Sequence, residues 1–329
     1  MNLILAKLEN QLIHVTRNRT IKMQTFLDQL SAQAENRFYG HIQILAKYCG
    51  LSGSPFLNGY LQHGWNATDG FGNYLGKKRF APKYVWSKRC EELIKPFRDN
   101  VYAIGAPWLY LEDVYPRKKV SEKKGIVAYP SHSSSWSVMG DTHLENAEFL
   151  YDNFKEVTVV LHRFDYSNSQ IRQNYEKLGH KTYCHGNGTP WEKDFDPMFL
   201  INQRDFLNQF HTVVANVMQT AVLYATSLGL ESIIAGPIDY SGVDVNDKAS
   251  QTGDGKTNWN KELEKNKNLW QIELGLNEKK DRAELKNLLG WDINKVSYNF
   301  LYARAKDLIY GSNLNISAKV LKSSIRKIK

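Results

Sequence analysis

Between residues 125 and 235, short apolar runs alternate regularly with amphipathic segments. Runs rich in Val, Ile and Ala predict buried strands, and the segments between them carry helical periodicity. Such alternation is typical of a parallel sheet wound with helices on both faces. Strands are predicted at residues 125–129, 157–161, 181–184, 212–215 and 232–235, and helices at 141–154, 169–178, 197–210 and 217–228.

The first half of the chain has weaker patterns of the same kinds. Helical periodicity runs through residues 21–50, and Ser87 is placed to cap a helix over 88–97. This half is short for a complete Rossmann domain, which leaves a reduced domain open. Its strands are predicted at residues 56–62, 84–87 and 101–111, the last interrupted by Gly105-Ala106-Pro107.

A charged segment with few apolar residues, 116–124, separates the halves and predicts a linker. The expected domains are an α/β domain over 1–115, a Rossmann-like domain over 125–258 and a Lys-rich helical region over 259–329. The predicted fold class is therefore α/β, with two Rossmann-like domains facing a central cleft and a helical C-terminal extension.

Charge adds a preference for anionic partners. The net charge is +9 and the pI is near 9.2, which favours nucleotide phosphates, acidic glycans, anionic lipids or nucleic acid. Basic strips lie at 77–89, at 117–124 and at the end of the chain. Each is either a solvated face or a contact with an anionic membrane surface.

Cysteine usage and hydropathy predict a cytoplasmic protein. Three cysteines without a CxxC pair argue against a disulfide framework or structural zinc and for a reducing compartment. The N-terminal apolar run is too short for a signal peptide, and no run approaches the ~20 apolar residues of a membrane span.

Histidines follow several predicted strands. His63 is followed directly by Gly64, which we expect to turn the backbone at the strand end. Carboxyl ends of parallel strands share one edge of a sheet, so these histidines are expected to converge as general bases or phosphate ligands. A turn histidine bonded to the backbone is the alternative, and no pair at ligand spacing indicates a metal. The histidines are His63, His132, His162 and His185.

Two further segments suit an anion. A serine-rich loop over 130–137, with Ser131 and Ser133, follows a strand and offers hydroxyl and N–H groups. Asn216 lies at a strand-to-helix turn, and the following helix opens with Gln219 and Thr220. A helix N-terminus is a usual binding site for a diphosphate. Asn216 is equally a candidate for the N-cap of that helix, and the serine-rich loop is equally a solvated loop.

The order of these motifs resembles the GT-B glycosyltransferases, and among them the bacterial capsule and teichoic-acid polymer enzymes, including CDP-glycerol glycerophosphotransferases. The resemblance covers about residues 55 to 240. Its motifs are Gln62-His63-Gly64-Trp65, Ile104-Gly105-Ala106-Pro107, Tyr129-Pro130-Ser131-His132, Leu161-His162-Arg163 and residues 216–220.

This resemblance implies transfer of a sugar or polyol phosphate from a nucleotide-activated donor to a glycan or lipid-linked glycan, such as capsule or lipopolysaccharide. It implies neither cofactor nor metal, no nucleic acid, and a cytoplasmic protein able to contact the inner face of the cell membrane. His63 would be the general base and His162 a second catalytic residue. The donor-side residues would be Ser131, His132, Ser133, Arg163, Asn216, Gln219 and Thr220, and the acceptor-side residues Gln62, Gly64, Trp65 and Asp69.

Two rival functions stay open. A nucleotide-sugar epimerase on the same fold needs carboxylates in the cleft, and the candidates are Asp165, Asp239 and Glu231. A non-catalytic nucleic-acid-binding protein fits the pI and the aromatic content, but no zinc-finger or RNA-recognition signature supports it. The sequence leaves open the donor, the acceptor, the stereochemistry and the oligomeric state.

Overall fold

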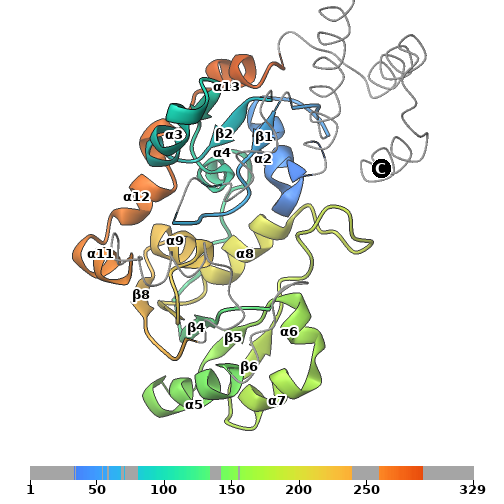
Figure 1. The fold of residues 1–329 in the computed structure, drawn as a ribbon. Helices are drawn as coiled ribbons and strands as arrows, with labels where there is room; N and C mark the ends of the chain where they lie inside the picture. Colours follow the sequence, from blue (N-terminus) through green and yellow to red (C-terminus); the bar gives the residue numbers. More distant parts are fainter. Residues whose placement is uncertain are drawn as a thin grey trace, which may run out of the picture.

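The computed structural model shows two parallel sheets surrounded by helices (Figure 1). It describes residues 33, 35–53, 55–57, 59–67, 70, 81–133, 142–154, 156–238 and 259–291. The predicted α/β class with two Rossmann-like sheets is therefore confirmed. The domain boundaries predicted above stay predictions.

The larger sheet has the strand order β6-β5-β4-β7-β8, with all strands parallel. In chain order this is 3-2-1-4-5, so the winding reverses between β4 and β7. Ligands of doubly wound sheets bind at such a switch point, outside the carboxyl ends of the strands. The strands are β4 (Ile126–Tyr129), β5 (Thr158–Val160), β6 (Lys181–Tyr183), β7 (Thr212–Ala215) and β8 (Glu231–Ile234).

Three helices cover the β4–β6 side of this sheet: α5 (Thr142–Phe154), α6 (Arg163–Ser167) and α7 (Ser169–Glu176). The apolar side chains of β4 and β5 are mostly buried, as the continuous apolar strands predict, whereas the edge strand β6 is largely exposed. The short helix α6, which begins directly after His162, was not predicted because its five residues are too few to show a period.

The smaller sheet contains β1 (Tyr60–Leu61), β2 (Lys83–Val85) and β3 (Val101–Ala103), paired in that order. Helix α3 (Lys88–Ile94) follows β2, and the Ser87 side chain accepts a hydrogen bond from the N–H of Cys90, as the capping prediction requires. Two predicted strands are shorter than expected. The strand at 56–62 retains only β1, and the strand at 101–111 ends at Ala103.

Pro107 explains the second correction. Its fixed φ and missing N–H suit the first turn of a helix, and the 3-10 helix η4 (Pro107–Tyr110) begins at this residue. Helix α4 (Leu111–Val114) continues from it. Elsewhere the short elements are η1 (Phe38–Gly40), α2 (His41–Tyr48), η3 (Lys95–Phe97) and η6 (Leu276–Glu278).

Helices α8 (Phe199–Leu207) and α9 (Thr220–Ser227) lie between the two sheets (Figure 1). Tyr224 of α9 stacks on Trp108 of η4, with ring centroids 4.0 Å apart and planes 6° from parallel. One hydrophobic cluster extends through both rings into each sheet. The two halves of the chain therefore share a core. Helix α9 begins at Thr220, three residues later than the helix predicted from 217.

The last described helices run from beside α9 and β8 back to the smaller sheet (Figure 1). They are α11 (Trp259–Lys265), α12 (Leu269–Glu273) and α13 (Arg282–Leu288). The N–H of Ala106 donates to the carbonyl of Leu274, and the Tyr84 hydroxyl donates to the carbonyl of Leu288. The described part of the predicted C-terminal region thus packs onto the first half of the chain, and its helix α12 also contacts α9.

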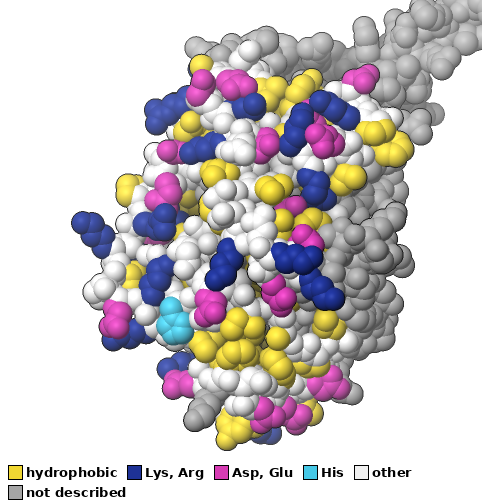
Figure 2. Space-filling view, turned by 90° about the vertical axis from the view of Figure 1, so that its left-hand side faces the viewer, with side chains coloured by type: hydrophobic (Ala, Val, Ile, Leu, Met, Phe, Trp, Pro, Cys, Tyr) yellow, Lys and Arg dark blue, Asp and Glu magenta, His cyan; other side chains and the backbone are white. Residues whose placement is uncertain are grey.

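Several cations of the basic strips are buried or ion-paired in the described residues, whereas residues 77–79 and 322–329 lie outside them. Lys83 is buried, with its ammonium 5.1 Å from the centre of the Tyr60 ring, and Lys88 pairs with Glu91 at 2.8 Å. In the second strip, Arg117 pairs with Glu112 and Lys124 with Glu122. On the face shown in Figure 2, Lys and Arg side chains alternate with Asp and Glu. Among the described helices, none has the length and apolarity to cross a bilayer.

Candidate functional site

The His63 turn, residues 62–67, follows β1. The imidazole of His63 is exposed, whereas Gln62 is fully buried. The Gln62 amide donates to the carbonyl of Gly64 (2.8 Å) and accepts from the backbone N–H of Trp86 (2.9 Å). Gln62 therefore shapes the turn, and its predicted place on the acceptor surface is wrong because its side chain is enclosed.

The turn contacts the N-terminus of α9. The N–H of Trp65 donates to Thr220 Oγ1 at 2.9 Å, and a Cβ built on Gly64 would lie 3.6 Å from the same oxygen. This contact brings His63, Gly64 and Thr220 together, which the sequence order alone only suggested. The backbone bends at Gly64, as expected, but Gly64 has an ordinary φ and room for a Cβ, so this bend does not depend on glycine.

A buried carboxylate on α12 holds the turn from behind. Glu273, 2% exposed, accepts from the indole N–H of Trp65 (2.5 Å) and from Arg89, with Nη2 to Oε2 at 2.9 Å. Arg89 also donates to the carbonyls of Asn66 and Ala67 at 3.1 Å. Trp65 is 8% exposed, so its side chain serves to hold the turn and offers little surface for the predicted contact with the acceptor.

At the switch point, Asn216 joins three segments. Its Oδ1 accepts from the N–H (2.8 Å) and the hydroxyl (3.1 Å) of Ser131, and its Nδ2 donates to the carbonyl of Pro237 (2.9 Å). Asn216 is 2% exposed and lies four residues before α9. It is therefore not the N-cap that the sequence offered as an alternative, and it holds the loop after β4 beside the end of β7.

The N-terminus of α9 lacks a side-chain cap. Gln219 occupies the N-cap position, but its side chain makes no capping hydrogen bond and donates instead to the carbonyl of Tyr129 at 2.7 Å. The first N–H groups of a helix attract anions through their unused donors and the helix dipole. This end of α9 is thus suited to a phosphate group.

The loop after β4 is anchored a second time through α6. The N–H of Ser133 donates to Asp165 Oδ2 at 2.9 Å, and His143 Nε2 lies 3.4 Å from Asp165 Oδ1. His143 Nδ1 in turn lies 2.9 Å from the Tyr175 hydroxyl. Burial alone would raise the pKa of Asp165, but the contacts with His143 and Ser133 outweigh it and lower the pKa. Asp165 is therefore an ionised anchor for the loop.

His132 and His162 form a stacked pair, with ring centroids 4.6 Å apart. Burial first, and then His132, lowers the pKa of His162 to about 4. His162 is therefore neutral near pH 7 and does not act as a cationic phosphate ligand. It can still offer an N–H to a ligand. His132 is exposed, and its Nδ1 donates to the carbonyl of Ser133 at 3.0 Å.

Arg163, the next predicted donor residue, is ion-paired with Glu192. The loop over 187–196 that carries Glu192 follows β6, so this pair links the ends of β5 and β6. His185 Nε2 lies 2.8 Å from the hydroxyl of Tyr129, the last residue of β4. Three of the four strand-end histidines therefore lie at the ends of β4, β5 and β6, whereas the turn that carries His63 contacts the start of α9, which follows β7.

Sequence reasoning missed the residues that brace the site from a distance. Arg89 and Glu273 are 184 positions apart, and no local pattern pairs them. Asp165 was singled out only as an epimerase carboxylate, although it closely follows His162. The predicted acceptor residue Asp69 lies outside the described residues.

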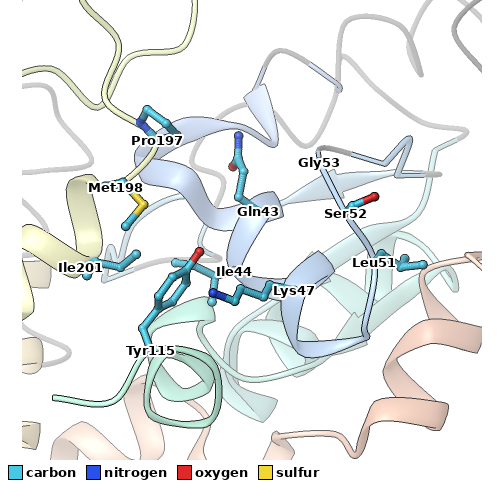
Figure 3. A pocket seen from close by; sticks show the side chains of 10 residues that line it. All are labelled: Gln43, Ile44, Lys47, Leu51, Ser52, Gly53, Tyr115, Pro197, Met198 and Ile201. Carbon is cyan, nitrogen blue, oxygen red and sulfur yellow. The ribbon is translucent and has the colours of Figure 1, made fainter.

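A cavity of about 440 Å³ lies apart from this site (Figure 3). Side chains of α2, α8 and Tyr115 line it, and the Lys47 ammonium sits 3.7 Å from the centre of the Tyr115 ring. None of the predicted site residues is among its lining residues, so the candidate site is the carboxyl edge of the larger sheet rather than this cavity.

No family model matches the chain, and no curated protein is similar in sequence. Three solved structures are similar at a distance. These are MnaA from S. aureus with UDP (13% identity, 61% of this chain and 54% of that chain, TM-score 0.33), a putative UDP-N-acetylglucosamine 2-epimerase from Listeria monocytogenes (14%, 70% and 58%, 0.32) and TarM (12%, 82% and 52%, 0.31). The chain spans about half the length of these proteins, and likenesses of this size do not decide a reaction.

Proposed function

We propose that this protein is a glycosyltransferase that moves a sugar or polyol phosphate from a nucleotide-activated donor to a hydroxyl group of a glycan. The observation that carries the proposal is the 2.9 Å hydrogen bond from Trp65 to Thr220, because it holds the His63 turn against the uncapped N-terminus of α9. A general base and a phosphate site must be neighbours for such a transfer.

In the proposed reaction His63 takes the proton of the acceptor hydroxyl as that oxygen attacks the donor. The bond from the transferred group to the nucleotide phosphate breaks, and the phosphate leaves with the bonding electrons. The N–H groups of α9, the Thr220 hydroxyl and neutral His162 would stabilise the negative charge that develops. The reaction needs no metal ion in this scheme. The acceptor would be a bacterial surface glycan such as capsule or lipopolysaccharide, reached from the cytoplasm.

An epimerase fits the carboxylates less well. Asp165 is 1% exposed and is bound to Ser133, so it does not face a sugar. Glu231 begins β8 and therefore lies at the amino edge of the sheet, away from the switch point. Asp239 lies outside the described residues. A nucleic-acid-binding role gains little from the second basic strip, where Arg117 and Lys124 are each paired with a carboxylate.

Nucleotide binding tests the proposal first. Thermal unfolding with CMP, CDP, GDP and UDP, each with and without EDTA, should give stabilisation by one nucleotide that EDTA does not remove. Silence from all four would contradict it.

The base assignment is tested separately. His63→Ala should abolish transfer from the donor identified in this way and change nucleotide affinity less than twofold, because the base contacts the acceptor. Equal loss of both properties would contradict the assignment to His63.

A further inference from the structure

Three aromatic rings meet at His63 and are here called the aromatic platform: Phe38, His63 and Trp191. His63 and Trp191 are exposed, and Phe38 is half-buried between them. Phe38 stacks on His63 with ring centroids 4.7 Å apart and planes 21° from parallel. The edge of the Trp191 indole meets Phe38 at 4.9 Å and 83°. Trp191 is 48% exposed although it is the largest type of apolar side chain. Exposed aromatic groups of this kind mark binding surfaces more often than isolated apolar residues do.

The loop that presents Trp191 is held firmly. Asn187, 2% exposed, donates from its amide to Asp194 (2.8 Å) and Glu192 (3.2 Å), and its Oδ1 accepts from the N–H of Thr189 (2.9 Å). The backbone of Asn187 also pairs with Phe195. The loop over 187–196 is thus closed at its base, and the exposure of Trp191 at its tip is not the result of a loose segment.

The segment that carries Phe38 is fixed against the same loop. The N–H of Tyr39 donates to the carbonyl of Gly188 at 2.9 Å, and the guanidinium of Arg37 lies 5.4 Å from the Phe195 ring. Tyr39 has φ 55°, a left-handed conformation that is rare for a bulky residue. Strained backbone of this kind persists where the surroundings enforce it, often at ligand sites. Here it directs Phe38 toward His63.

We propose that the aromatic platform is a stacking subsite for one pyranose ring of the acceptor, an inference that rests on the function proposed above. The face of a pyranose with axial C–H groups is apolar and packs on aromatic rings, while its hydroxyl groups need polar partners at the edge. The platform supplies both, because Glu192 follows Trp191 directly and is paired with Arg163. A ring held there would place its hydroxyls beside His63.

Saturation-transfer NMR with methyl β-glucopyranoside, methyl β-galactopyranoside and methyl N-acetyl-β-glucosaminide tests this. At least one glycoside should receive saturation chiefly on the axial hydrogens of one face. Trp191→Ala should weaken its binding roughly tenfold, and Trp191→Phe should retain most of it. Tyr151→Ala is the matched control, since Tyr151 is 50% exposed on α5, and it should change nothing.

The outcomes separate the two proposals. Binding of a nucleotide with no Trp191-dependent sugar signal would overturn the platform and leave the proposed function standing. Sugar binding with no nucleotide binding would overturn the function and leave the platform. A third outcome is saturation transfer to the base of the nucleotide that is lost in Trp191→Ala. It would show that the aromatic platform binds the base, and it would overturn the sugar assignment.

Discussion

The backbone N–H of Trp65 donates a 2.9 Å hydrogen bond to the hydroxyl oxygen of Thr220, joining residues 155 positions apart. Trp65 lies two residues after His63, and Thr220 is the first residue of α9. A single bond therefore sets the spacing between the predicted base and the predicted phosphate site. Because the acceptor is a side chain, the bond can be removed without altering His63.

Thr220→Val should remove this bond with little change in shape. We expect a loss of about 1 kcal/mol in the free energy of unfolding and a large fall in transfer, because His63 is no longer held against α9. The direct measurement is hydrogen exchange at the Trp65 amide, which should lose protection in Thr220→Val and keep it in Thr220→Ser. Protection that survives in the valine variant would contradict the bond.

Glu273→Ala should be costly because it leaves Arg89 and the Trp65 indole without their shared acceptor. We expect a loss of roughly 2–4 kcal/mol by urea unfolding. The exposed pair between Lys181 and Glu156, with side chains 72% and 71% exposed, provides the control. Glu156→Ala should leave the free energy of unfolding nearly unchanged, because solvent screens an exposed pair. Similar losses in the two variants would show that burial does not strengthen the Glu273 contacts.

Local patterns predicted the elements whose causes are local. Continuous apolar runs indicated β4, β5 and β7 because these strands are buried on both faces of the larger sheet. Ser87 indicated its helix because a cap acts over three residues. The extent of the strand at 101–111 was wrong because apolar content continues into η4, while the turn of the backbone is set by Pro107. The helix predicted from residue 217 began too early because the apolar residues Val217 and Met218 come before the true start of α9 at Thr220.

The site depended on contacts that no period reveals. Lys83 reads as one member of a solvated basic strip, yet it is fully buried over the Tyr60 ring. Glu273 lies in a charged helical region, and only folding brings it to Trp65. The strand-end rule did place His132 and His162 together, because the geometry of parallel strands is general. Phe38 and Trp191 meet at His63 only through the packing of two loops.

Stability should fall in mild acid. Burial, with a smaller contribution from His63, lowers the pKa of His41 to about 3. Burial lowers the pKa of His185 to about 4, and the pKa of His162 is also about 4. The unfolded chain, with histidine pKa near 6.5, binds protons that the folded protein does not. The contribution of these histidines to the free energy of unfolding is therefore fully present above about pH 6.5 and is lost as the pH falls toward 4.

Each of these histidines should contribute a loss of about 2 kcal/mol or less between pH 7.5 and pH 5. Urea unfolding at the two pH values measures the difference, and His162→Phe should make it smaller by one histidine's share. An unchanged difference in that variant would show that His162 titrates normally in the folded protein.

Asp165→Asn should loosen the loop after β4. The amide can still accept from Ser133, but the charge that faces His143 is lost, so we expect a loss of roughly 1–3 kcal/mol. Affinity for the nucleotide should fall because Ser131 and Ser133 are held less firmly. Calorimetric titration beside Asp152→Asn, an exposed position on α5, measures this. Unchanged nucleotide affinity would separate the Asp165 anchor from the phosphate site.

The two glycines that flank the His63 strand should respond in opposite ways to alanine. Gly59 has φ 141°, and a Cβ there would lie 2.6 Å from the carbonyl oxygen of Pro82 and 2.8 Å from the Tyr84 ring. Gly59→Ala should therefore cost roughly 2 kcal/mol or more, because strand β1 must shift. Gly64→Ala meets only Thr220 Oγ1 at 3.6 Å, at an ordinary φ, and should change stability by less than about 1 kcal/mol. Thermal unfolding of the two variants decides the matter. A large loss for Gly64→Ala would show that the turn after His63 requires a glycine.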